Sequence, residues 1–489
     1  MTSAFRAMLV ASVLSLLASC SYRYAVEVEP PDAALYVDGT PVAAGAVFES
    51  KEKSVSVRAE AVGHVPHEGR LDAAGPFGMA RLAVVLEPIR YPVTVATVAP
   101  GSTLSVDGGA ALDLPAALEL AHGSHVLELR APDRPPQAVA IVIDGPRDFL
   151  FRHLPSLPEA PGLVLEQLGV ARTGRQPKSV VFSPDSRLFV VNLLDDGGFQ
   201  VFDAATLAEL DFVKPEGFAA SKGFVEGIFV EGSFVAEPGE YWVSQMTTGT
   251  VFRRDVAELG TGTPGTVDAY PTGGSWSKVI AYSPALDLVA VSNWLSNDVT
   301  LLERETGAPA GRIGPVPVPR GLAFSPDGEL LYVTSYDAGL FLKYRVADGK
   351  ELARIALPGA NMRHVVLAPD AGTAWVSDMG LNAVYEVELA AFRVVSTLKT
   401  SINPNTIDLT PDGGWLFAST RGPNNPESYL LRSLKPGKLE VFDLATKTRV
   451  ISMEGGTQPT GLDVSPDGTL LAFTNFQDDT VELYRIAMK

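Results

Sequence analysis

The sequence predicts an all-β protein in which a seven-bladed β-propeller follows two small modules of short strands. Three observations support this fold class. A unit of alternating apolar runs and polar turns recurs at a spacing of about forty residues in the C-terminal part of the chain. Strand and turn patterns fill the N-terminal part. The 45 Gly and 37 Pro residues suit many short strands joined by turns, and 46% hydrophobic against 20% charged residues is the balance of a folded chain.

One copy of the repeated unit shows its structure most clearly. It runs from Arg320 to Gly349 and contains an apolar alternating run, the turn Ser325-Pro326-Asp327-Gly328, a second run, and a third run that ends in an Asp-Gly turn. Such runs form a strand meander, which is one propeller blade. The copies align on a proline, at Pro184, Pro284, Pro326, Pro369, Pro411 and Pro466. The first gap holds a further copy without the proline, Val225 to Gly232, so seven copies result.

The ring of blades needs a closing strand, because an open last blade would leave an exposed sheet edge. The last copy supplies only three strands before Lys489. We therefore expect Leu163 to Leu168, just upstream of the first blade, to pair beside Val481 to Ile486 as the fourth strand of blade seven.

The first twenty residues have the pattern of a targeting signal. A short basic start precedes the apolar run Ala7 to Leu17, which is too short to span a bilayer, and Leu17-Ala18-Ser19-Cys20 follows. This pattern resembles the lipobox of bacterial lipoproteins and implies that Cys20 is acylated after residues 1–19 are removed. Cys20 is the only cysteine, so no disulfide forms within the chain. Ser21 stands where an aspartate would mark inner-membrane retention, so we expect a lipid-anchored cell-envelope protein of the outer membrane.

Two N-terminal stretches resemble each other and a known module. Pro30 to Gly39 (PPDAALYVDG) and Pro100 to Gly108 (PGSTLSVDG) each lead through an alternating run into an Asp-Gly hairpin turn. Both look like the opening of PEGA domains, which are small β-sandwiches of bacterial envelope proteins, and the resemblance implies a spacer or adhesive role. The predicted domains are the signal peptide 1–19, PEGA-like β-sandwiches at 20–88 and 89–152, a Pro-rich linker at 153–162 and the propeller at 163–489.

Charge and motifs argue against several classes of function. The net charge of −18 disfavours nonspecific binding of nucleic acid, so we expect no nucleic-acid partner and contact with the membrane only through Cys20. The pairs His64/His67 and His122/His125 do not predict a metal site, because residues three apart on a strand point to opposite faces. No nucleophile elbow, phosphate loop or haem-attachment motif is present, so no cofactor is expected.

Short motifs recur in the propeller repeats. They include Phe182-Ser183-Pro184-Asp185, Tyr332-Val333-Thr334-Ser335 and Val464-Ser465-Pro466-Asp467-Gly468. These motifs resemble the YVTN or YncE-like group of seven-bladed propellers, which has lactonase-type propellers as relatives. The resemblance is specific for the fold. It does not identify an activity, because this architecture hosts many unrelated functions.

The central channel is where we expect a ligand. In each blade the first strand lines the channel, and the residues six before the aligned proline are Lys178, Glu226, Lys278, Arg320, Arg363, Asn405 and Thr460. Four of these seven residues are basic in an acidic chain, which predicts a rim that attracts anions. The residues just after the second strands are mostly large, namely Leu193, Met246, Trp294, Tyr336, Met379, Arg421 and Phe476. The alternative is that the basic residues are solvated or paired, and that the large ones cover blade interfaces.

The predicted function is non-catalytic recognition of an anionic small molecule, a glycan or a protein partner at the cell envelope. The ligand-binding set is Lys178, Lys278, Trp294, Arg320, Tyr336, Arg363, His364 and Arg421. The next channel layer is Ser179, Gly227, Val279, Gly321, His364, Thr406 and Gly461. Deeper in the channel, Asp408 and Asp463 lie on adjacent blades. Either one of them is protonated, or a cation bridges them, or water in the channel solvates both.

Two other functions remain open. Arg363-His364 and the later Ser377-Asp378 resemble part of the site of lactonase propellers, with Ser and Asp where that family has Asn and Glu. The resemblance implies a hydrolase in which His364, with Asp378, acts as a general base and Arg363 holds an anionic group. The other alternative is an assembly scaffold with an inert channel, and the inserted loop Arg421 to Gly437 is a candidate lid or docking loop in any of these functions.

Overall fold

The computed structural model describes residues 21–75, 78–97, 101–132, 134–151, 159–214, 228–235, 239–261, 267–428 and 431–488. The predicted signal peptide with Cys20, most of the predicted linker, and Glu226 and Gly227 lie outside these residues. Within them the protein is built from β-strands and one short 3₁₀ helix, η1 (Val256–Glu258), which confirms the predicted all-β class. No helix among the described residues is long and apolar enough to cross a membrane.

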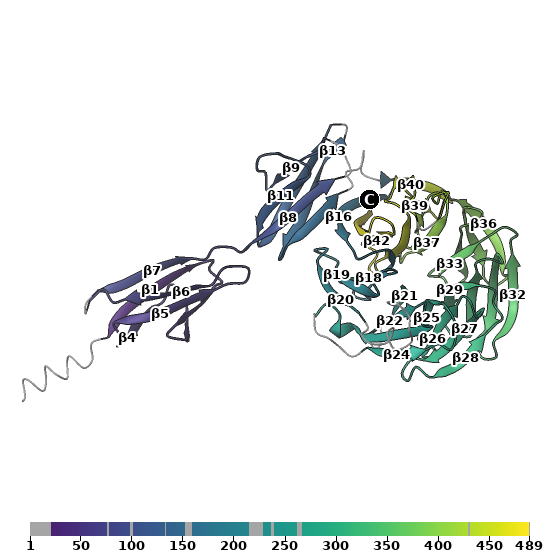
Figure 1. Cartoon of the computed structure of the whole chain (residues 1–489), viewed down its shortest axis with the longest axis horizontal. Helices are drawn as coiled ribbons and strands as arrows, with labels where there is room; N and C mark the ends of the chain where they lie inside the picture. Colours follow the sequence, from purple (N-terminus) through teal and green to yellow (C-terminus); the bar gives the residue numbers. More distant parts are fainter. Residues whose placement is uncertain are drawn as a thin grey trace, which may run out of the picture.

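The first N-terminal module is a β-sandwich (Figure 1). Its sheets have the orders β4-β1-β7 and β3-β2-β5-β6, with β1 (Tyr22–Glu29), β2 (Ala34–Val37), β3 (Thr40–Val42), β4 (Val47–Ser50), β5 (Ser54–Glu60), β6 (His67–Asp72) and β7 (Met79–Val85). Alternation along the strands places one set of side chains between the sheets, where Tyr24, Leu35 and Val55 share one apolar core.

The second module repeats this arrangement. Its sheets have the orders β10-β9-β12-β13 and β11-β8-β14, with β8 (Arg90–Thr97), β9 (Thr103–Val106), β10 (Leu112–Asp113), β11 (Ala116–Ala121), β12 (Gly123–Ala131), β13 (Arg134–Ile143) and β14 (Arg147–Phe151). In both modules the first and last strands pair in parallel, β1 with β7 and β8 with β14. Both Asp-Gly turns also match: Asp38 (φ 46°) and Asp107 (φ 51°) have left-handed backbones, and their carboxylates accept the N–H of Ser56 and of Val126, each at 2.8 Å. The two modules are thus copies of one β-sandwich.

The propeller consists of seven antiparallel sheets arranged in a ring (Figure 1). Blades one to three contain β17 (Pro177–Phe182), β18 (Leu188–Leu193), β19 (Gly198–Asp203) and β20 (Glu209–Val213); β21 (Phe229–Val235), β22 (Glu240–Gln245), β23 (Thr250–Asp255) and β24 (Asp268–Pro271); and β25 (Ser277–Ser283), β26 (Leu288–Asn293), β27 (Asp298–Glu303) and β28 (Pro309–Ile313). Blades four to six contain β29 (Pro319–Phe324), β30 (Leu330–Ser335), β31 (Leu340–Arg345) and β32 (Lys350–Ala356); β33 (Met362–Leu367), β34 (Thr373–Asp378), β35 (Ala383–Glu388) and β36 (Arg393–Lys399); and β37 (Pro404–Leu409), β38 (Trp415–Thr420), β39 (Lys438–Asp443) and β40 (Thr448–Glu454).

Blade seven closes the ring with a strand from upstream of blade one, as predicted. It contains β41 (Pro459–Val464), β42 (Leu470–Asn475), β43 (Thr480–Met488), β16 (Leu163–Arg172) and the short β15 (Glu159–Ala160). The strand β16 runs antiparallel to β43, with Leu165 opposite Ile486 and Ala171 opposite Val481. The Gln167 amide also donates to the Tyr484 hydroxyl at 3.0 Å. Both ends of the propeller sequence therefore lie in one sheet, which removes the open edge.

The register of blade two differs from the prediction by four residues. In blades three to seven, two residues of the first strand lie opposite one residue of the second, for example Arg320 and Gly321 between the pairs Pro319–Ser335 and Leu322–Val333. In blade two the corresponding pair is Val230 and Glu231, rather than Glu226 and Gly227. The cause is a local duplication: the tetrapeptide Phe-Val-Glu-Gly occurs twice in FVEGIFVEG, residues 224–232, and no proline marks the correct copy.

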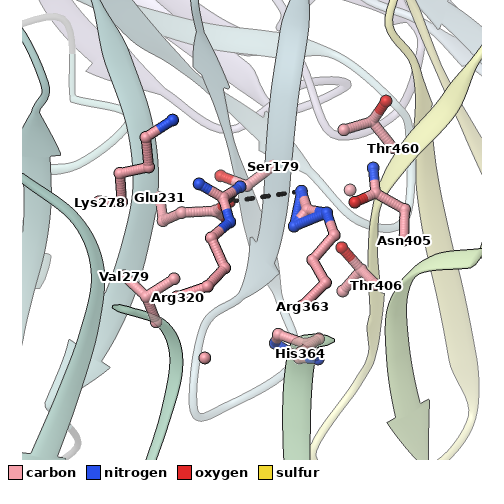
Figure 2. Close-up of polar contacts among 12 residues, drawn as sticks. Ser179, Glu231, Lys278, Val279, Arg320, Arg363, His364, Asn405, Thr406 and Thr460 are labelled. Carbon is pink, nitrogen blue, oxygen red and sulfur yellow. Dashed lines mark hydrogen bonds and ion pairs between the residues drawn. The ribbon is translucent and has the colours of Figure 1, made fainter. Parts of the chain in front are cut away.

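The β-bulge in the first strands of blades two to seven determines which side chains reach the channel. A regular strand would send successive side chains to opposite faces. The bulge places two consecutive residues opposite one residue of the neighbouring strand and turns both toward the channel (Figure 2). The position six residues before the aligned proline and the position after it therefore both line the channel.

In blades two to seven, a hydroxyl on the second strand holds the bulge in place. This hydroxyl oxygen accepts a hydrogen bond from a backbone N–H of the bulge in its own blade, at 2.7–3.4 Å. The hydroxyls are those of Ser244, Ser292, Thr334, Ser377, Ser419 and Thr474. The same hydroxyl donates to the bulge carbonyl of the next blade in five cases, to Lys278, Arg320, Arg363, Asn405 and Thr460, at 2.5–3.2 Å. Each of these hydroxyls thus connects two blades at the channel.

We predict that Thr334→Val destabilises the protein by roughly 1–3 kcal/mol. Valine keeps the shape of threonine but leaves the Gly321 N–H and the Arg363 carbonyl without their shared buried partner. Thr334→Ser keeps the hydroxyl, which serine supplies in four other blades, and is expected to cost much less. Urea unfolding of the three proteins measures the difference. Equal stability of the Val and Ser variants would show that the hydroxyl does not hold the blades.

Candidate functional site

Basic side chains from consecutive blades meet at the mouth of the channel. Lys278 of β25, Arg320 of β29 and Arg363 of β33 occupy the same bulge position, and their side chains extend into a common space (Figure 2). They are only 7%, 3% and 5% exposed. Lys178 in blade one and Arg421 at the end of β38 complete the group, since both interact electrostatically with Arg363. We call these five residues the cation cluster.

One carboxylate faces the cation cluster among the described residues. Glu231 of blade two contacts Arg320 through Oε1 and Nη2 at 3.1 Å and approaches Arg363 Nη2 at 3.9 Å (Figure 2). The sequence prediction missed Glu231 because of the four-residue slip in blade two. The repeated FVEG tetrapeptide was the only signal that could have pointed to it.

Burial and mutual repulsion destabilise the charges of the cluster. Burial lowers the pKa of Arg320. Burial is also the largest cause of the lowered pKa of Lys278, and repulsion from Arg320 and Arg363 lowers it further. The pKa values of Lys178 and Arg363 fall for the same two reasons. Glu231 opposes these shifts but carries a single negative charge against five positive ones. The described site therefore favours an additional anion electrostatically.

Aromatic rings lie against the cluster. The Lys278 Nζ is 3.7 Å from the centre of the Trp294 ring, and the Arg320 guanidinium is 5.6 Å from it. In blade three, Trp276 stacks on Trp294 with the ring centres 6.2 Å apart. The ring centre of Tyr336, in blade four, lies 5.7 Å from that of Trp294. We call Trp276, Trp294 and Tyr336 the aromatic row. The sequence predicted Trp294 and Tyr336, but it missed Trp276 because the position two residues before the bulge was not considered.

The remaining two cations lie over a different ring. Lys178 Nζ is 5.2 Å and the Arg421 guanidinium 5.7 Å from the centre of the Phe476 ring. Arg421 also bonds to the Gln458 amide oxygen. Two of the large residues after the second strands, Trp294 and Phe476, thus lie against cations. Leu193 and Phe476 are also buried.

Several buried polar atoms at the channel mouth have no hydrogen-bond partner in the described part of the chain. They are Arg320 Nη1, Trp294 Nε1 and both amide atoms of Asn405, which is 0% exposed. Asn405 occupies the bulge position of blade six, next to Arg363 in blade five. Buried donors without partners cost free energy unless another group satisfies them. They mark this mouth as a place where a ligand would gain hydrogen bonds.

The residues of the lactonase alternative do not form a catalytic pair. His364 Nδ1 lies 3.0 Å from the Ile407 carbonyl, and burial lowers the pKa of His364 to about 4. The Asp378 carboxylate instead accepts the N–H groups of Asn361 and Gly380 and the Tyr385 hydroxyl, and it is 0% exposed. No described contact joins His364 to Asp378. Asp378 therefore holds the loop after β34, which corrects the expected role.

Asp408 and Asp463 approach each other deeper in the channel. Each accepts one backbone N–H from the next blade, Asp408 from Val464 at 2.8 Å and Asp463 from Phe182 at 2.7 Å, and the two carboxyl groups hydrogen-bond to each other. Burial raises the pKa of Asp408 to about 6, while burial and the Asp408 charge raise the pKa of Asp463. A shared proton, one of the three possibilities raised by the sequence, accounts for this contact. No group of three or more potential metal ligands occurs among the described residues.

The predicted docking loop of blade six is held against blade seven. The Arg432 guanidinium donates to the Gln477 carbonyl at 2.8 Å and pairs with Asp478, and the Ser433 N–H donates to the Gln477 side chain. Tyr429 and Leu430 lie outside the described residues. The described part of the loop thus extends the channel face beside blade seven.

The fold and its channel define a seven-bladed β-propeller, and two comparisons identify its relatives. The family described as "Lactonase, 7-bladed beta-propeller" matches residues 321–489, which confirms the predicted relation to lactonase-type propellers. "Antigen Lp49" of Leptospira interrogans serogroup Icterohaemorrhagiae serovar copenhageni (strain Fiocruz L1-130) is 37% identical over 322 residues, covering 64% of this chain and 68% of the antigen. The chain belongs to the family of Antigen Lp49.

We predict that the Asp408–Asp463 pair makes stability depend on pH. The folded pKa values lie above the ordinary values, so the folded protein holds a proton that the unfolded chain releases. This stabilisation is complete below about pH 4 and is lost as the pH rises through about 6. Between these pH values the native protein should lose roughly 1–3 kcal/mol relative to Asp463→Asn, in which one of the two buried titrating carboxyl groups is replaced by a neutral amide. Denaturant unfolding of both proteins from pH 4 to 7 measures this, and parallel curves would contradict it.

Proposed function

We propose that the propeller is a non-catalytic binding module that recognises an anionic group at its channel mouth. The observation that carries this proposal is the charge balance of the site: five basic side chains face one carboxylate among the described residues, and three of them are more than nine-tenths buried. Burying unpaired charge is unfavourable, and a bound anion would offset that cost. The unpartnered atoms of Arg320, Trp294 and Asn405 supply hydrogen bonds for such a ligand.

The geometry supports binding more than catalysis. A group with a pKa of about 4 is a weak general base at neutral pH. The charge of Glu231 raises the pKa of His364 but does not offset the larger effect of burial. The name of the matching family refers to lactonases, yet the acid expected to support His364 is used to hold a loop. Turnover of a lactone by the purified protein would revive the hydrolase alternative.

A thermal-shift experiment with acetate and inorganic phosphate tests the proposal. Ligand at a hundredfold excess over its Kd stabilises the native state by about 2.7 kcal/mol, which raises the Tm by several degrees. Arg320→Gln together with Arg363→Gln should abolish the shift. Arg393→Gln is the control. Arg393 lies in blade five, as Arg363 does, but its side chain is 66% exposed and pairs with Glu388 at the surface.

Substitution of Glu231 tests the direction in which the affinity for the anion changes. Because Glu231 competes with the ligand for Arg320 and Arg363, Glu231→Gln should bind the anion roughly threefold to tenfold more tightly. Weaker anion binding by Glu231→Gln would contradict the proposed charge logic. No shift by either anion in any variant would overturn the proposal and favour the scaffold alternative, in which the buried cluster only supports the ring.

We also propose that the protein is anchored in the bacterial cell envelope through acylated Cys20. The residues up to Cys20 support this, and the relative's designation as an antigen is compatible with such a location. The protein is expected in the membrane fraction after expression in a bacterium, and Cys20→Ser should release it into the soluble fraction. The same distribution for both proteins would exclude the lipid anchor.

A further inference from the structure

We infer that the anion bound at the channel mouth carries a ring with a flat apolar face, which lies on the aromatic row. This inference rests on the proposed function, because it describes the body of a ligand whose anionic head binds the cation cluster. Aromatic and sugar rings both present such faces, so the chemical class is a ring-bearing acid of either source.

The first argument is the position of Trp276. Just before the first strand, the equivalent residue has a left-handed backbone in five blades and is Gln176, Trp276, Val318, Asn403 and Gln458, with φ between 45° and 59°. In three of the five blades this residue is Asn or Gln, and Asn tolerates this conformation better than most residues. A tryptophan with φ 59° brings no advantage to the turn and carries a conformational cost. The large exposed ring therefore points to a role outside the turn.

The second argument is the shape of the aromatic row. Trp276 and Trp294 are stacked with an interplanar angle of 18°, whereas Tyr336 is tilted by 50° relative to Trp294. The two tryptophans thus form a platform and the tyrosine stands at an angle to it. Trp276 is 37% exposed, although large apolar side chains are normally buried. A planar ligand group would cover this surface.

The third argument is that the platform and the cations are in contact. Arg320 and Lys278 both lie over the Trp294 ring, and Arg320 Nη1 and Trp294 Nε1 are both buried donors without a partner in the described residues. A carboxylate or phosphate held by these donors would place the group attached to it beside the aromatic row. A small anion would satisfy the donors but leave Trp276 uncovered, so the complete site fits a larger acid.

Isothermal titration calorimetry with defined probes tests this inference. The ring acids are phenylacetate and glucuronate, the small anions are acetate and inorganic phosphate, and the neutral ring controls are phenylethanol and methyl glucoside. We expect at least one ring acid to bind at least tenfold more tightly than acetate, and neither neutral ring to bind measurably. Which acid shows the gain identifies the source of the ring.

Two variants separate the platform from the charge site. Trp276→Ala should remove the tenfold preference for the ring acid over acetate. Because Lys278 Nζ also lies 5.7 Å from the centre of the Trp276 ring, the affinity for acetate is measured in the same variant, and the ratio of the two affinities is the readout. Leu381→Ala is the matched control, because Leu381 is an apolar side chain in the loop after β34 with 42% exposure, and it should change neither affinity. If acetate or phosphate binds and no ring acid binds better, or if Trp276→Ala keeps the gain, this inference fails while the proposed function stands. If no anion binds, both fail.

Discussion

The hydroxyl shared between neighbouring blades is the interaction on which the channel depends. In five blades it accepts the N–H of its own bulge and donates to the bulge carbonyl of the next blade. A hydroxyl is suited to this position because one atom is both donor and acceptor. The bulge residue that it holds is the residue that carries the cation, as with Arg363 above Thr334. The same bond therefore joins the ring and positions the binding groups.

This arrangement explains how an acidic protein maintains a positive site. The whole chain carries a net charge of −18, yet the channel mouth gathers side chains from blades one, three, four, five and six. Four of the five cations occupy the same position in the first strands of their blades, and Arg421 follows the second strand of blade six. Closure of the ring therefore brings together charges that are far apart in the sequence. Low-dielectric walls around such a group strengthen its field. The aromatic rings beneath Lys278 and Arg320 offset part of the cost of burial.

The sequence predicted the parts of the fold that repeat, and it failed where a residue departed from the repeat. Six turn prolines and one copy without a proline gave seven blades, and the missing fourth strand of blade seven led to the pairing of Leu165 with Ile486. The same alignment found Lys278, Arg320 and Arg363, because the bulge recurs in each blade. Glu231 was missed because two equal tetrapeptides compete for one register, and only strand pairing distinguishes them. Asp378 was misassigned because local sequence does not show that its carboxylate accepts the loop's own N–H groups.

The channel has two charged layers, the cation cluster at its mouth and the Asp408–Asp463 pair below it. Asp408 and Asp463 lie three residues beyond the bulge position of their strands, deeper than Asn405 and the cations. Since the pKa of Asp408 is raised to about 6, the pair carries negative charge at neutral pH. An anion at the cation cluster would be attracted by the cations and repelled by the Asp408–Asp463 layer below. The neutral Asn405 lies in the cation layer, at the bulge position next to Arg363. In the proposed function, this order of charges would keep an anionic head beside Arg320 and Arg363, within reach of the aromatic row.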